Sequence, residues 1–298
     1  MQTTVNRNTY IKENEPKKKI VIIKKKNIVS WMIFAAMTIV AFIQFFPLVW
    51  VLDFSFSKDT DLFGSSILTI PNPIQWRNYV TAFVDGHVLQ YALNSLVVCS
   101  LTISITVLLS LTLGYAFTRM EWKLRGFFMS IILLGMMVPI HATLLPNFLV
   151  YSKIHILNTY LALLLPYIAF ALPTGVFIMS GFLESIPKSL EESAFMDGCG
   201  VYRTIFSIIL PVTKPAIVTV TVMTFLSVWN EFILANTYLS TTTFRTLPFS
   251  VFEFSSKYVS QYSVQFAVMV ITAIPAIAVY IVLNEHITKG VTMGAVKG

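Results

Sequence analysis

The sequence predicts an all-α membrane protein, a polytopic bundle of six transmembrane helices. The first observation is its composition: 56% of the residues are hydrophobic, 12% are charged, and the mean hydropathy is +0.74, which is too apolar for a soluble domain. The second is a set of six charge-free apolar runs separated by polar loops. The third is that the basic residues lie beside these runs, a pattern typical of membrane orientation rather than of nucleic-acid binding.

The apolar runs divide the chain into three parts. Residues 1–26 are hydrophilic and contain two lysine triplets, so we expect a cytoplasmic basic tail at the anionic inner face of the membrane, not a cleavable signal peptide. Residues 27–288 hold the runs, and residues 289–298 form a cytoplasmic C-terminal tail. Five runs exceed the roughly 20 residues that a transmembrane helix needs. The six runs are residues 27–52, 88–118, 126–152, 154–183, 215–230 and 258–284.

Lysine and arginine are unequally distributed between the two predicted sides of the membrane. Of the 21, five lie in the loops of one side and the others lie in the two tails and in the loops near residues 119–125 and 185–214. By the positive-inside rule the side richer in these residues is cytoplasmic. We therefore expect a multi-pass protein of the plasma (cytoplasmic) membrane with both termini inside. The outer loops, 53–86 and 238–257, either receive a soluble partner or are simply solvated.

The most polar loop, residues 185–211, predicts two short helices with a break between them. Pro187 suits the first turn of a helix, and Glu191 and Glu192 complement its dipole. Gly198 is expected to take the left-handed conformation that closes this helix. Leu190, Ala194 and Phe195 would then share a small apolar face.

The spacing in this loop resembles the signature of the membrane subunits of binding-protein-dependent ABC importers. In that signature a Glu and two small residues are followed by three residues and a Gly, and after nine more residues by Ile-x-Leu-Pro. The resemblance implies that the loop is a coupling helix docked on a separate ATPase subunit. The ATPase-coupling residues so implied are Glu191, Glu192, Ser193, Ala194, Asp197, Gly198, Ile208, Leu210 and Pro211. Ser193 stands where the family usually has Ala. The bland alternative is an ordinary cytoplasmic hairpin.

The resemblance extends from the first run to the last residue and is strongest for the carbohydrate-uptake branch, the second permease subunit of maltose-type and glycerol-phosphate-type importers. It covers Asn94-Ser-Leu, Tyr115-Ala-Phe-Thr-Arg119 and the C-terminal end. It implies a permease domain at 27–288 and a partner set of a second homologous permease, two ATPase subunits and an extracellular binding protein. It further implies that ATP and Mg are bound in the partners, with no cofactor in this chain. The C-terminal residues implied to contact the ATPases are Gly294, Ala295, Val296, Lys297 and Gly298.

Polar residues inside the apolar runs are candidates for the substrate path. The third run contains two prolines with polar neighbours, and proline in a membrane helix is tolerated only against protein or water. The fifth run is extended by residues 232–239, and Glu231 is the one carboxylate that then falls within a predicted span. We expect Glu231 to lie near the outer interface of the membrane. An equal alternative is that these polar residues only pack against neighbouring helices and line no path. The candidate path residues are Asn94, His141, Thr143, Asn147, Trp229, Asn230 and Glu231; Trp229-Asn230-Glu231-Phe232 resembles a tetrapeptide of the sugar branch.

Other classes of protein fit the sequence less well. A secondary transporter needs ionisable groups near the middle of several helices, and a membrane-embedded enzyme needs clustered His and carboxylates. The sequence shows neither, so we expect no catalytic and no metal-binding residues, and no P-loop Gly-x-x-x-x-Gly-Lys-Ser/Thr occurs. The prediction is a permease subunit of an ATP-driven importer for a di- or oligosaccharide. The alternative prediction, a permease for amino acids, peptides or another small solute, is supported by the same loop.

Overall fold

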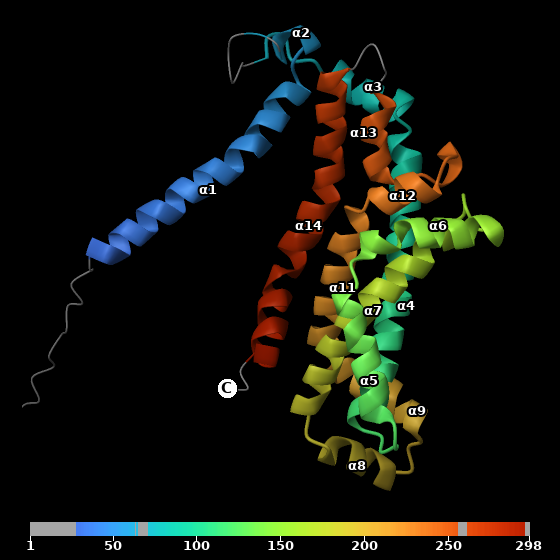
Figure 1. Ribbon diagram of the computed structural model, residues 1–298. Coiled ribbons are helices and arrows are strands. Elements are labelled where there is room, and N and C mark those ends of the chain that lie inside the picture. Colours follow the sequence, from blue (N-terminus) through green and yellow to red (C-terminus); the bar gives the residue numbers. More distant parts are fainter. Residues whose placement is uncertain (1–27, 63, 65–70, 256–260, 296–298) are drawn as a thin grey trace, which may run out of the picture. The chain divides into compact units, whose positions relative to one another are not determined.

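A computed structural model of the chain describes residues 28–62, 64, 71–255 and 261–295, and side chains from residue 30 to residue 282 within these ranges. The regular elements in these ranges are all helices (Figure 1). The chain divides into two compact units, residues up to 48 and residues from 49 on. The first unit holds most of helix α1 (Ile28–Ser55), whose side chains from residue 30 to residue 48 are exposed or half-exposed. Residues 30–48 carry no charged side chain, which suits a helix that crosses a membrane.

The second unit is a helical bundle. Its elements are α2 (Asp59–Leu62), α3 (Arg77–Asp85), α4 (Val88–Thr118), α5 (Arg125–Leu134), η1 (Gly135–Met137), η2 (Ile140–Thr143), α6 (Leu144–Lys153), α7 (Leu161–Ser185), α8 (Ser189–Met196), α9 (Val201–Arg203), η3 (Thr204–Ile209), α10 (Leu210–Val212), α11 (Lys214–Trp229), α12 (Ile233–Tyr238), η4 (Thr242–Phe244), η5 (Leu247–Phe249), α13 (Ser250–Glu253) and α14 (Tyr262–Ala295). In Figure 1, α8 lies at one end of this bundle and α3 lies near the other end.

The predicted membrane helices are present, but two of them are bent. Within the described residues, α1, α4, α7 and α14 are long and apolar enough to cross a membrane singly. Two further spans are bent pairs of helical segments, 125–137 with 140–153 at 92° and 201–212 with 214–229 at 77°, so the number of spans is four, or six if each pair counts as one. The all-helical membrane fold is thus confirmed; the third predicted span is bent within its run, and the fifth is bent just before its run begins.

The third predicted helix breaks at Val138 and Pro139, which both have extended backbones. Proline lacks the N–H that would continue the helix and disfavours helical geometry in the residue before it, so the break falls where the sequence places Pro139. By contrast, Pro166 and Pro173 stand inside α7, and Pro275 stands inside α14.

The fifth predicted helix was expected to continue past Glu231. Instead α11 ends at Trp229, and a separate short helix, α12, begins at Ile233. The backbone of Phe232 has φ −126° and ψ −36°, outside regular helical geometry. The apolar pattern continues across this break, which is why hydropathy did not predict it.

The centre of the bundle is the close contact between α4 and α7. Gly175 of α7 lies against Ser110 of α4, and a Cβ atom added to Gly175 would stand 2.1 Å from Ser110 Oγ. Gly114 of α4 lies against Met179 in the same way, with its added Cβ 3.2 Å from Met179 Cγ. Small residues at a helix contact let two backbones approach closely, which is how membrane helices gain packing energy without a hydrophobic driving force.

Buried apolar side chains form two clusters along the bundle. One contains Leu163, Trp229 and Leu234 and extends to the 247–254 segment. The other contains Leu111, Met179 and Ile209 and lies at the ends of α4 and α7 that lead toward α8. The helix α8 therefore follows directly from a packed region of the bundle.

Candidate functional site

The predicted coupling helix is α8, and its closing glycine has the expected conformation. Gly198 has φ +80°, in the left-handed region, and no other described glycine has a positive φ. Glu191 and Glu192 lie in the first turn of α8, as expected. Pro187 does not, because the helix begins at Ser189 and Pro187 lies two residues before it.

The C-terminal end of α8 is closed by a Schellman motif. The Cys199 N–H donates to the Ala194 carbonyl at 2.9 Å, and the Gly198 N–H donates to the Phe195 carbonyl at 3.0 Å. These are the two hydrogen bonds that define the motif, and they satisfy carbonyls that a helix end otherwise leaves without partners. The break between the two helices of the loop therefore has a fixed geometry.

The side chains of α8 divide into two groups. Only Glu191 and Ala194 are buried, at 5% and 4% exposure. Leu190, Phe195 and Met196 are exposed, and Met196 reaches 88%. The expected common face of Leu190, Ala194 and Phe195 is therefore wrong, because Ala194 packs inward while the two larger side chains remain accessible.

Glu191 is held by a residue that the sequence analysis did not assign to this site. The Arg119 Nε lies 2.8 Å from Glu191 Oε1, and both side chains are buried, at 7% and 6% exposure. Arg119 is the residue that caps the C-terminal end of α4. An arginine that ends a long apolar run was the available signal, but its partner could not be read from the sequence.

The other predicted coupling residues lie along the same loop. Glu192, Ser193, Asp197 and Pro211 are exposed, and Ile208 and Leu210 are half-buried. Ile208 belongs to η3, a segment of π-helix, which leads into α10 and then to the bend before α11. The C-terminal residues Gly294 and Ala295 lie at the end of α14, and residues 296–298 lie outside the described residues.

A cavity of about 350 Å³ lies between α7, α11 and the η1–η2 bend. Most of its wall is apolar, and the polar groups include Tyr167, Thr174, Ser227 and Glu231. Of the seven candidate path residues, Glu231 alone lines this cavity. Concave, mainly apolar pockets with a few polar groups are the usual form of small-molecule sites.

The Glu231 carboxylate makes three hydrogen bonds within the protein. It accepts the Leu234 N–H at 2.7 Å, the Ala235 N–H at 3.2 Å and the Tyr167 hydroxyl. The first two are orphan donors of the first turn of α12, so Glu231 acts as the side-chain cap of that helix. The third joins α7 to the α11–α12 break at one end of the cavity.

The other candidate path residues lie apart from this cavity. Trp229 is buried, and its Nε1–H donates to the Thr272 carbonyl of α14 at 3.1 Å, whereas Asn230 lines a separate pocket with Phe232 and Phe252. His141 is exposed, and Asn147 donates to Thr143 Oγ1 at 3.1 Å within α6 and the preceding turn. The sequence thus placed seven residues on one path, and the structure divides them among several environments.

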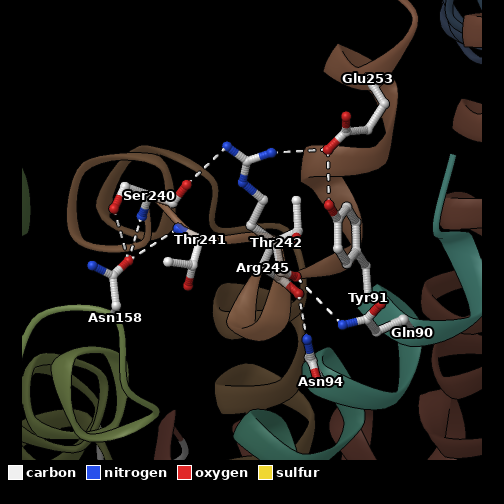
Figure 2. A network of polar contacts seen from close by, with 9 residues as sticks. All are labelled: Gln90, Tyr91, Asn94, Asn158, Ser240, Thr241, Thr242, Arg245 and Glu253. Carbon is white, nitrogen blue, oxygen red and sulfur yellow. Dashed lines mark hydrogen bonds and ion pairs between the residues drawn. The ribbon is translucent and has the colours of Figure 1, made fainter.

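Asn94 belongs to a polar network between the first turns of α4 and the loop that follows α12 (Figure 2). Its Nδ2 donates to the carbonyls of Thr243 and Arg245 at 2.9 and 2.8 Å. Arg245 in turn pairs with Glu253 at 2.9 Å, and Glu253 accepts the Tyr91 hydroxyl at 2.8 Å. These contacts fasten the 240–253 loop to the first turns of α4, so Asn94 has a structural role there.

In the part of the chain that the structure describes, no three His, Cys, Asp or Glu side chains gather as metal ligands would. The fold and the loop together define a multi-pass helical membrane protein, whose polar helix is rigidly capped and largely exposed.

The family follows from the comparisons with known proteins. Residues 106–293 match the model of the "binding-protein-dependent transport system inner membrane component", and the chain belongs to this family. A putative ABC transporter permease protein, ORF2 of Caldicellulosiruptor sp., is 34% identical over 85% of this chain and 91% of its own length. The permease protein SmoH of a sulfoquinovosyl glycerol transport system of Agrobacterium fabrum is 30% identical over 89% of this chain and 93% of its own.

A solved structure has the same fold. A chain of a bacterial ABC transporter involved in the import of the acidic polysaccharide alginate superposes with a TM-score of 0.77, covering 88% of this chain and 97% of that one at 22% identity. The family that the sequence predicted is therefore confirmed: the chain is a permease subunit, the membrane component of an ABC transporter.

Proposed function

We propose that this chain forms the translocation path of an ATP-driven carbohydrate importer, together with a second homologous permease. A di- or oligosaccharide is the substrate, and an extracellular binding protein delivers it. The named relatives support this choice, because SmoH belongs to a transport system for a glycoside and the solved neighbour to an importer of a polysaccharide. Both termini and α8 face the cytosol, which the excess of Lys and Arg on that side supports.

The observation that carries the proposal is the exposed surface of α8. Leu190, Phe195 and Met196 are accessible on a helix of eight residues that attaches to the bundle through two buried side chains. An exposed apolar surface beside the carboxylate of Glu192 is suited to a protein partner rather than to water. We assign this surface to an ATPase subunit, with one such subunit for each permease.

The nucleotide chemistry belongs to those partners. The sequence contains no Gly-x-x-x-x-Gly-Lys-Ser/Thr loop that would cradle phosphates, so ATP and Mg are bound in the ATPase subunits. The C-terminal residues 294–298 add a second ATPase contact. The cavity bordered by Tyr167 and Glu231 is this chain's share of the substrate path.

The test is ATP hydrolysis and uptake by the complex of this chain with its neighbouring permease, ATPase and binding protein in liposomes. Stimulation by one oligosaccharide, among a panel that includes amino acids and peptides, is the expected result. Stimulation by amino acids or peptides alone would be consistent with an ABC importer but would refute a carbohydrate as its substrate. If no ATPase subunit copurified with the unaltered chain, the importer itself would be refuted.

A variant of the docking surface tests the role of α8. Glu192→Lys reverses an exposed charge in the first turn and should lower both the amount of copurifying ATPase subunit and the rate of uptake. The matched control is Glu121→Lys, an exposed carboxylate in the loop between α4 and α5 on the same proposed side. Equal assembly and uptake by the two variants would contradict the docking assignment.

A further inference from the structure

Three helices meet at one buried arginine. Arg119 caps α4, its Nη2 donates to the carbonyls of Leu183 and Ile186 at 2.7 Å each, and its Nε lies 2.8 Å from Glu191 of α8. Leu183 is in the last turn of α7, and Ile186 is the residue that follows that helix. The guanidinium therefore fills carbonyl positions that the end of α7 leaves open, and joins them to α4 and α8.

This ion pair is a buried polar contact that joins α8 to the end of α4. Of the eight residues of α8, only Glu191 and Ala194 are buried, and Ala194 offers a single methyl group. A methyl group can slide across a neighbouring surface, whereas a buried ion pair has one favourable geometry. Displacing it would separate two opposite charges whose side chains are buried, which is costly.

Arginine is specifically suited to this position. Its planar group carries donors in a fixed arrangement, so one side chain holds a carboxylate and two carbonyls at the same time. A lysine would keep the charge but present one ammonium, and could not fill these positions with the same geometry.

Glu191 and Glu192 therefore differ in role, although they are neighbours. Glu192 is exposed and available to a partner, whereas Glu191 faces the bundle and is bound within the protein. We propose that Arg119 and Glu191 are positioning residues that make α8 move as one body with the adjoining ends of α4 and α7. The inference rests on the proposed coupling function, since it says how a displacement of α8 by the ATPase reaches the substrate path, which α7 lines.

The experiment separates docking from transmission. The complete complex is reconstituted with Arg119→Gln, with Glu191→Gln, with the double substitution and with Arg119→Lys, and three quantities are measured: copurifying ATPase subunit, ATP hydrolysis, and substrate transported per ATP. The matched control is Arg125→Gln, an exposed arginine at the start of α5 whose Nη1 donates to the Met120 carbonyl at 3.4 Å.

We expect the single variants to bind the ATPase and to hydrolyse ATP, but to transport about tenfold less substrate per ATP, the scale typical of couplings between sites. The double variant should be no worse than either single variant, because the two residues act through one contact. Arg119→Lys should restore only part of the ratio, and Arg125→Gln should leave it unchanged.

Three results would overturn the inference. The first is a normal ratio of transport to hydrolysis in Arg119→Gln with the complex intact. The second is a loss of ATPase binding in the Glu191 variant equal to that in Glu192→Lys, which would make Glu191 a docking residue. The third is failure of Arg119→Gln and Glu191→Gln to accumulate in the membrane while Arg125→Gln accumulates, which would assign the pair to folding. Absence of the ATPase from the unaltered complex refutes the proposed function instead.

Discussion

Replacing Gly198 by alanine tests the closure of α8 by conformation alone. A Cβ atom at Gly198 would have no other atom within 4 Å, so the substitution creates no clash, and its cost comes from φ +80°. An L-residue in the left-handed region costs about 1–2 kcal/mol relative to glycine, which corresponds to a factor of roughly 5–30 in an equilibrium constant. The Schellman motif of α8 should open more often by that factor.

Hydrogen exchange of the complex measures this opening. The amides of Gly198 and Cys199 donate the two hydrogen bonds of the motif, so residue 198 of the alanine variant and Cys199 should exchange roughly 5–30-fold faster. Substrate transported per ATP should fall as well, because a frayed helix end transmits displacement poorly.

The matched control is Gly200→Ala. Gly200 also has open space around its added Cβ, but its φ is −76°, which alanine adopts without strain. Gly198→Asn should be milder than Gly198→Ala, since asparagine tolerates the left-handed region better. If the two alanine variants exchanged and transported alike, the conformational argument would be refuted.

Two further predictions concern the interior. Gly175→Ala places a Cβ 2.1 Å from Ser110 Oγ and should destabilise the protein by about 1–3 kcal/mol, measured as a lower melting temperature. Gly181→Ala is the control, because it lies in the same helix with open space around its added Cβ and should not destabilise the protein. An equal effect of both substitutions would contradict the close packing of α4 and α7. Glu231→Ala removes the cap of α12 and should cost about 1–2 kcal/mol, again measured by melting, with Tyr167→Phe costing less because the two N–H bonds remain. An unchanged melting temperature in Glu231→Ala, with altered substrate dependence, would make Glu231 a substrate ligand without a structural role.

The sequence predicted those features that one residue type dictates locally. Gly198 was placed in the left-handed region because glycine alone adopts it without strain, and the third helix breaks beside Pro139 because proline cannot continue the hydrogen bonding. The bounds of α4 coincide with the charge-free run, since lipid penalises charge in every turn.

Features that depend on contacts distant in sequence were not predictable. The sequence around Glu191 and Glu192 does not indicate which of the two faces Arg119, which lies 72 positions before Glu191 in the chain. Trp229 was a candidate for the substrate path, yet its Nε1–H donates to a carbonyl of α14, 43 positions further on. Both outcomes depend on how helices are rotated about their axes, which hydropathy does not specify for helices that are apolar on all sides.

The bend of 92° between the two halves of the third span has a practical consequence for producing the protein. Met136, Met137 and Val138 are exposed at the bend, and backbone that departs from helical geometry inside a bilayer needs protein or water beside it. If the proposed second permease lies against this bend, a subunit synthesised without it would present the bend to lipid. We therefore expect the chain to be degraded by membrane quality-control proteases when expressed singly, and to accumulate when both permease genes are expressed together.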